Sequence, residues 1–140
     1  ILRREIEGSD SPRRALRHAY GDLVSTFQTF CARKAKGLEG DKPTFQELFP
    51  TRKYFQQCSG IDILEDLEGN DLLTIRRLFQ KRHVCQHAEG KITDLYIKKI
   101  PEDRQLLGQD VELSLEEFEA GARVLRIVLD KLCRRFERRL

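Results

Sequence analysis

The sequence contains no long apolar run. A membrane-spanning helix needs about 18 or more consecutive, mostly apolar residues, and no stretch of this chain comes near that length. We therefore expect no membrane span. The chain begins with Ile1 instead of methionine and shows no signal peptide. We interpret it as a trimmed piece of a longer polypeptide, in which residues 1–10 are a tail or the end of a preceding element.

Closely spaced cysteine pairs are also missing. None of the four cysteines belongs to a CxxC pair, which argues against a zinc ribbon. Cys31, Cys85 and Cys133 fall on apolar helical faces, where a free cysteine behaves as a small buried hydrophobe. We therefore predict reduced thiols and a cytoplasmic protein.

The 140 residues, of which 35% are charged and 39% hydrophobic, suit one compact domain over residues 11–140. Three long stretches place apolar residues three and four positions apart, which is the spacing of an amphipathic helix. The sequence therefore predicts an all-α fold, namely an antiparallel helical bundle of three long helices plus short helices.

Local signals predict where the long helices begin and end. Ser11 followed by Pro12 predicts the start of the first helix. The second helix is expected over about 71–88, with Asn70 or Asp71 as its cap. Ser114 with Glu117 forms a capping-box pattern that predicts the start of the last helix.

The shorter elements are predicted from similar signals. Residues 41–69 read as short helical pieces and turns, with Thr44 and Glu47 as a second capping box. A helical turn is expected over 93–100, ended by Pro101, and an extended or irregular stretch over 106–113.

The most informative feature lies in the second predicted helix. Its apolar stripe consists of Leu72, Ile75, Leu78, Phe79 and Cys85. Arg82 and Gln86 fall in the middle of this stripe, and His87 follows at the helix exit. A guanidinium directed at the packed side of a helix needs a partner, because an unpaired buried charge is costly. This polar interruption predicts a binding or catalytic site.

Charge is distributed unevenly along the chain, although its net value is only +3. Basic residues crowd the C-terminus and surround the candidate site, the latter being Arg76, Arg77, Lys81, Arg82 and Lys91. Acidic residues gather over 62–71 and 102–119. This asymmetry permits an anionic ligand. A solvated helix surface with favourable basic residues at a helix end is the simpler explanation.

The segment Arg82-His83-Val84-Cys85-Gln86-His87 resembles the Arg-x4-His signature of the HEPN superfamily. These are small all-α domains, many of which are metal-independent ribonucleases. The family usually has a polar residue after the arginine, here His83, and sets the motif near the end of a long helix. Residues 11–138 match that arrangement, and residues 87–96 and 108–114 look like the segments that follow the motif in bacterial HEPN-like domains.

The resemblance implies a concrete chemistry that needs neither metal nor cofactor. His87 would be the general base that activates the ribose 2′-hydroxyl, and Arg82 would stabilise the charge on the pentavalent phosphate. Gln86 and His83 would position phosphate oxygens. Residues five apart on a helix differ by about 140° in direction, so the family brings two motifs together in a symmetric homodimer. The expected substrate is therefore RNA, bound in a basic cleft at a two-fold interface.

Two details of the pattern narrow this prediction. Arg13 and His18 also match Arg-x4-His, but they lie at the start of a helix with Arg14 after the arginine, so we treat the match as coincidental. One HEPN subset carries tyrosine two residues after the motif histidine. Here that residue is Glu89, so a modification switch at this position is not supported.

Other interpretations remain open at the level of the sequence. Arg82 could bridge helices through a carboxylate such as Asp62, Glu65 or Asp66, and His87 could be an ordinary C-terminal helix residue. His83 and His87 have the i, i+4 spacing of two metal ligands, although no third ligand is obvious. The chain could then be a non-catalytic HEPN-like helical module that mediates protein or RNA binding, including binding to a regulatory protein.

Overall fold

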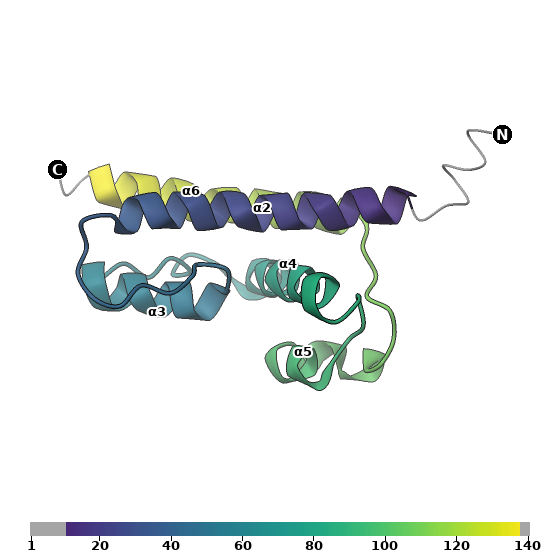
Figure 1. Ribbon diagram of the computed structural model, residues 1–140. Helices are drawn as coiled ribbons and strands as arrows, with labels where there is room; N and C mark the ends of the chain where they lie inside the picture. Colours follow the sequence, from purple (N-terminus) through teal and green to yellow (C-terminus); the bar gives the residue numbers. More distant parts are fainter. Residues whose placement is uncertain (1–10, 138–140) are drawn as a thin grey trace.

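The structure is a computed structural model that describes residues 11–137 (Figure 1). The expected tail over residues 1–10 lies outside the described residues. Over the described part the fold is all-α, as predicted, and contains no strand, only an isolated antiparallel bridge between Lys91 and Asp110. In chain order the helices are α2 (Ser11–Ala35), α3 (Leu48–Ser59), α4 (Gly69–His87), α5 (Asp94–Lys99), the 3-10 helix η1 (Pro101–Leu106) and α6 (Leu115–Glu137).

The long helices α2, α4 and α6 all contact one another and form the body of the fold. Figure 1 shows α2 and α6 side by side in one layer, with α3 and α4 in a second layer and α5 beyond α4. Consecutive long helices run in opposite directions, as predicted. Arg123 meets Asp71 at one end of the α4–α6 contact, and Lys81 meets α6 at the other. As a result, α2 and α6 run parallel to each other.

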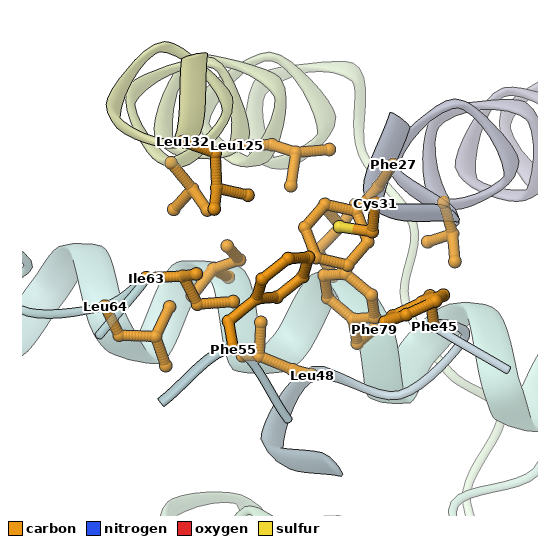
Figure 2. Packing of buried hydrophobic residues seen from close by; sticks show 14 of the residues in the cluster. Phe27, Cys31, Phe45, Leu48, Phe55, Ile63, Leu64, Phe79, Leu125 and Leu132 are labelled. Carbon is orange, nitrogen blue, oxygen red and sulfur yellow. The ribbon is translucent and has the colours of Figure 1, made fainter. Parts of the chain in front are cut away.

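Aromatic side chains hold the main core together (Figure 2). Phe27 of α2 packs edge-on against Phe79 of α4, with ring centroids 5.1 Å apart. Phe55 of α3 packs in the same way against Phe136 of α6, at 6.0 Å. Each such ring removes a large apolar area from water, and edge-to-face pairs add about 1 kcal/mol beyond that burial. The first contact fixes α2 against α4, and the second fixes α3 against α6.

Gly121 lets α4 and α6 approach closely. It is buried, and a Cβ at this position would lie 3.3 Å from Leu78 Cδ1. Such a distance is tighter than ordinary packing, so a larger residue at this position would require the Leu78 side chain to shift by a few tenths of an ångström. A smaller apolar cluster, formed by Val84, Ile92, Tyr96, Ile100 and Val111, anchors the C-terminal half of α4 to α5 and the following segment.

The helix starts at both ends of the chain follow the sequence signals. Helix α2 begins at Ser11 with Pro12 in its first turn. The hydroxyl of Ser114 accepts a hydrogen bond from the Glu117 backbone N–H at 3.1 Å, as the capping box predicts. The carboxylate of Glu117 does not complete the box, because it accepts hydrogen bonds from Lys81 and Tyr20 instead.

Two other boundary predictions are wrong. Helix α4 begins at Gly69 and ends at His87, with Glu68 as its N-cap and no side-chain capping bond, instead of being capped by Asn70 or Asp71. Thr44 does not cap α3. Its hydroxyl accepts a hydrogen bond from the Gln46 backbone N–H. Helix α3 starts later, after the N-cap residue Glu47, whose side chain makes no capping hydrogen bond.

Between α4 and α6 the predicted turn and extended stretch are both present. Thr93 caps α5 by accepting a hydrogen bond from the Tyr96 backbone N–H at 3.2 Å. Pro101 ends that region but also opens η1, which the sequence signals did not predict. The extended stretch then pairs with the exit from α4, where the Val111 N–H donates to the Gly90 carbonyl at 2.7 Å.

Candidate functional site

Arg82 lies on α4 and is only 8% exposed. Arg82 is thus buried, as its position in the apolar stripe predicts, whereas Gln86, which the same stripe includes, is exposed. Within residues 11–137 its guanidinium has no ion pair and no hydrogen bond. Burial lowers the pKa of Arg82 below its ordinary value, but arginine keeps its proton at any physiological pH. The side chain as a whole is mostly buried, and its permanent positive charge has no partner within the described residues.

The other four basic residues that the sequence pattern placed around the candidate site are paired, in contrast to Arg82 itself. The closest ion-pair distances are 3.1 Å for Arg76–Glu102, 2.6 Å for Arg77–Asp103, 2.8 Å for Lys81–Glu117 and 2.6 Å for Lys91–Asp110. The first two pairs join α4 to η1, the third joins α4 to α6, and the fourth lies within the segment between α4 and α6. They leave Arg82 as the unneutralised member of the basic cluster that the sequence singled out.

A structural role for Arg82 as a bridge to a carboxylate is wrong. Asp62 instead accepts two hydrogen bonds of 2.8 Å from Arg52. Glu65 and Asp66 both pair with Lys131 of α6, at 3.0 and 3.1 Å. All three acidic candidates are therefore engaged elsewhere.

Arg82 lines an open groove of about 650 Å³ between α2 and α4. From α4 come Arg82, Cys85 and Gln86, and from α2 come Arg14, Arg17, His18, Gly21, Asp22 and Ser25. Both sets follow spacings of three and four residues, so each is one face of its helix. Three guanidinium groups against one carboxylate make the groove electropositive, which suits an anionic ligand.

Arg17 also lines this groove, and its guanidinium lies close to the backbone of Gly90. Its Nε is buried and has no hydrogen-bond partner among the described residues. Its Nη2 lies only 2.6 Å from where a Cβ of residue 90 would be. Gly90 also has a φ of +79°, which favours glycine. The glycine that follows the motif thus leaves room for a second arginine beside Arg82.

The two motif histidines lie together, away from the groove lining. The rings of His83 and His87 have centroids 4.7 Å apart. Burial, followed by the electrostatic effects of the neighbouring His87 and of Lys99, lowers the pKa of His83 below its ordinary value. His87 is exposed at the last residue of α4. The structure therefore brings Arg82 together with Gln86, and His83 together with His87, but it does not join the two pairs within one chain.

His18 is the groove residue that sequence reasoning missed. The match of Arg13 and His18 to the motif spacing was interpreted as coincidental, and Arg13 indeed donates to the Val111 carbonyl at 3.3 Å instead of lining the groove. His18, however, shares the groove with Arg82. The signal available in the sequence was the polar face formed by residues 14, 17 and 18 of α2, opposite the apolar one.

Cys85 is the only thiol in the groove lining. It is half-buried and free, and burial raises its pKa despite the nearby charges of Arg17, Arg13 and Lys81. Cys31 is fully buried, and burial raises its pKa to about 12. Both thiols are therefore protonated at neutral pH.

A second, smaller cavity of about 470 Å³ lies on the other side of α4. Its buried charges are satisfied: Asp103 accepts hydrogen bonds from Arg77 at 2.6 Å and from the Tyr96 hydroxyl at 2.7 Å. Lys81 donates to the Glu112 carbonyl and to Glu117. Complete pairing of this kind is typical of a structural network.

In residues 11–137 no cluster of three or more histidine, cysteine and acidic side chains has an arrangement suited to a metal ion. In the same range no helix combines the length and apolar character needed to cross a membrane. No protein-family model, curated protein or solved structure matches this chain.

Proposed function

We propose that this chain is a metal-independent endoribonuclease domain that acts as a symmetric homodimer. The observation that carries the proposal is the unpaired guanidinium of Arg82 in an electropositive groove. Holding a charge there without a partner costs free energy. A phosphodiester entering the groove supplies the missing anion and accepts two parallel hydrogen bonds from the guanidinium.

The assigned chemistry is transesterification within the RNA strand. His87 takes the proton of the ribose 2′-hydroxyl, and the 2′-oxygen attacks the adjacent phosphorus. Arg82 stabilises the negative charge that accumulates on the phosphoryl oxygens in the pentavalent transition state. The product ends are a 2′,3′-cyclic phosphate and a 5′-hydroxyl.

Dimerisation supplies the geometry that one chain lacks. Arg82 lines the groove, whereas His87 lies outside its lining, in contact with the His83 ring. A two-fold related copy docked on this face would bring its own His87 to the groove of the first chain. In that arrangement Gln86 and the partner's His83 position the phosphate oxygens, and each dimer contains two composite sites.

The separation of Arg82 from His87 within one chain also favours a second function. The groove alone is sufficient to bind an RNA strand without cleaving it, in the manner of a non-catalytic helical module. In this case the cost of the buried charge is offset by binding and no proton transfer takes place. A cleavage assay distinguishes the two functions, because both the ribonuclease and the binding module bind RNA but only the ribonuclease cleaves it.

The first test is cleavage of a mixed RNA pool in EDTA by the wild type, Arg82→Ala and His87→Ala. Arg126→Ala is the matched arginine control, because this side chain is 84% exposed on α6, away from the groove. We expect each site variant to lose about 100-fold or more in rate, and cyclic phosphate ends in the wild-type product. RNA binding without cleavage by the wild type would establish the binding module instead.

The composite site is tested by mixing the two inactive variants. A heterodimer of Arg82→Ala and His87→Ala chains contains one intact site and one doubly altered site. Random exchange of subunits therefore restores about a quarter of the wild-type activity. No recovery, with heterodimer formation verified by mass spectrometry, would show that the two residues do not act across a dimer interface.

A further inference from the structure

Cleavage of RNA through its 2′-hydroxyl involves two proton transfers, of which the proposed roles of Arg82 and His87 cover only one. The 2′-hydroxyl loses a proton as its oxygen attacks phosphorus. The 5′-oxygen that departs must gain a proton, because an alkoxide is a poor leaving group at neutral pH. A second residue that exchanges protons near neutral pH is thus required beside the bound phosphate.

Histidine is the only side chain whose ordinary pKa lies between 5 and 8, and the chain contains three of them. Two of these, His83 and His87, have their rings against each other and do not line the groove. The third, His18, lines the groove that holds Arg82. The thiol of Cys85 lies in the same groove, but burial raises its pKa and makes it a weak proton donor.

The geometry of α2 places His18 next to the expected position of the phosphate. Arg14 lies one turn before His18 on the same helix face, and Arg17 precedes it directly. Together with Arg82 on the opposite wall, these arginines surround the volume that a phosphate would occupy. The His18 side chain is exposed to that volume, so its ring can reach an oxygen at the edge of the phosphate.

We propose that His18 is the general acid of this site, a role that rests on the proposed ribonuclease function. The protonated imidazole gives its proton to the ribose 5′-oxygen as the bond from phosphorus to that oxygen breaks. At the same time the 2′-oxygen forms its bond to phosphorus, and its proton goes to His87. The reaction consumes and produces no net proton, and it requires no further reagent.

Two RNA oligonucleotides with a single cleavable linkage test this assignment. One has the natural bridging 5′-oxygen and the other has sulfur in that position. A thiolate leaves without protonation because a thiol is far more acidic than an alcohol. We expect His18→Ala and His18→Gln to cleave the oxygen substrate about 100-fold more slowly than the wild type. Both variants should cleave the sulfur substrate at nearly the wild-type rate.

His87→Ala is the matched comparison, since loss of the general base slows both substrates alike. The ratio of sulfur to oxygen cleavage within one variant does not depend on how much of the protein is folded. Equal loss on both substrates in the His18 variants, or no loss on either, would overturn the role of His18 while leaving the ribonuclease in place. Failure of the wild type to cleave either substrate would overturn the ribonuclease, and His18 as its acid with it.

Discussion

Lys81 and Arg82 are neighbours on α4, and both are more than nine-tenths buried, yet only one of them is neutralised. The ammonium of Lys81 lies 2.8 Å from a Glu117 carboxylate oxygen and donates to the Glu112 carbonyl at 2.8 Å. Arg82 has neither kind of partner within residues 11–137 and faces the groove between α2 and α4. The two cations therefore differ in what they do. Lys81 joins α4 to α6, and Arg82 remains available to a ligand.

Replacement of Lys81 should destabilise the fold. In Lys81→Met the half-buried Glu117 carboxylate and the Glu112 carbonyl lose their shared donor, and a polar group left without its partner costs about 1–2 kcal/mol. We expect a decrease of this size in the free energy of unfolding, measured with urea at pH 7. Arg126→Met, which removes an exposed cation, should change it by less than about 0.5 kcal/mol. A similar small change for Lys81→Met would contradict the structural role of this pair.

Replacement of Arg82 should have the opposite effect. Arg82→Met fills the same space with an apolar chain and removes an unpaired buried charge, so the free energy of unfolding should stay constant or rise by about 1 kcal/mol. RNA binding by the same variant, measured by fluorescence anisotropy, should weaken strongly. A more stable protein that has lost its ligand is the signature of a residue kept for function. A decrease in stability of more than about 1 kcal/mol would point to a structural role instead.

Acid should weaken the contact between η1 and α4. Burial by itself would raise the pKa of Asp103, but hydrogen bonds from Arg77 and Tyr96 outweigh it and hold the pKa below its ordinary value. A carboxyl whose pKa is lower in the folded state stabilises the fold above its unfolded pKa, about 3.9. That contribution is lost as the pH falls through the lower, folded pKa.

The variant Asp103→Asn should therefore be less stable than the wild type by about 2 kcal/mol at pH 6. The difference should shrink steadily below pH 4, because the wild type loses its charge there as well. Urea unfolding curves between pH 6 and pH 2 measure this difference. A difference that is independent of pH would show that the charge on Asp103 does not stabilise the fold.

Cys85 provides a chemical probe of groove occupancy. Since burial raises its pKa, its reaction with N-ethylmaleimide at pH 8 should be slow but measurable by peptide mass spectrometry. A 2′-O-methyl RNA strand cannot be cleaved by this route. At about ten times its Kd, it should slow modification of Cys85 by about tenfold. Cys133, a half-buried thiol of α6 outside the groove lining, should react at an unchanged rate. Unchanged modification of Cys85 would place the strand elsewhere on the protein.

Much of the fold was predictable because local signals and helical periodicity act over a few residues. Pro12 and Ser114 marked the starts of α2 and α6, and both starts are confirmed. The N-cap prediction for α4 failed. The N-cap is Glu68 instead of Asn70 or Asp71, and its side chain makes no capping hydrogen bond. A capping side chain contributes only about 1 kcal/mol, which the packing of neighbouring segments readily exceeds.

The sequence by itself determined the three amphipathic helices, because apolar residues at helical spacing define the packed face of each. It did not determine which polar residue of the α4 stripe is buried, since Arg82 is buried and Gln86 is exposed. Which charges are neutralised was decided by the tertiary structure alone. Glu117 is 36 positions from Lys81, and only the packing of α6 on α4 brings them together. Likewise, the packing of α2 on α4 places His18 in the groove that Arg82 lines and leaves His87 outside the lining of that groove. Long-range pairing depends on how helices cross, which helical periodicity does not encode.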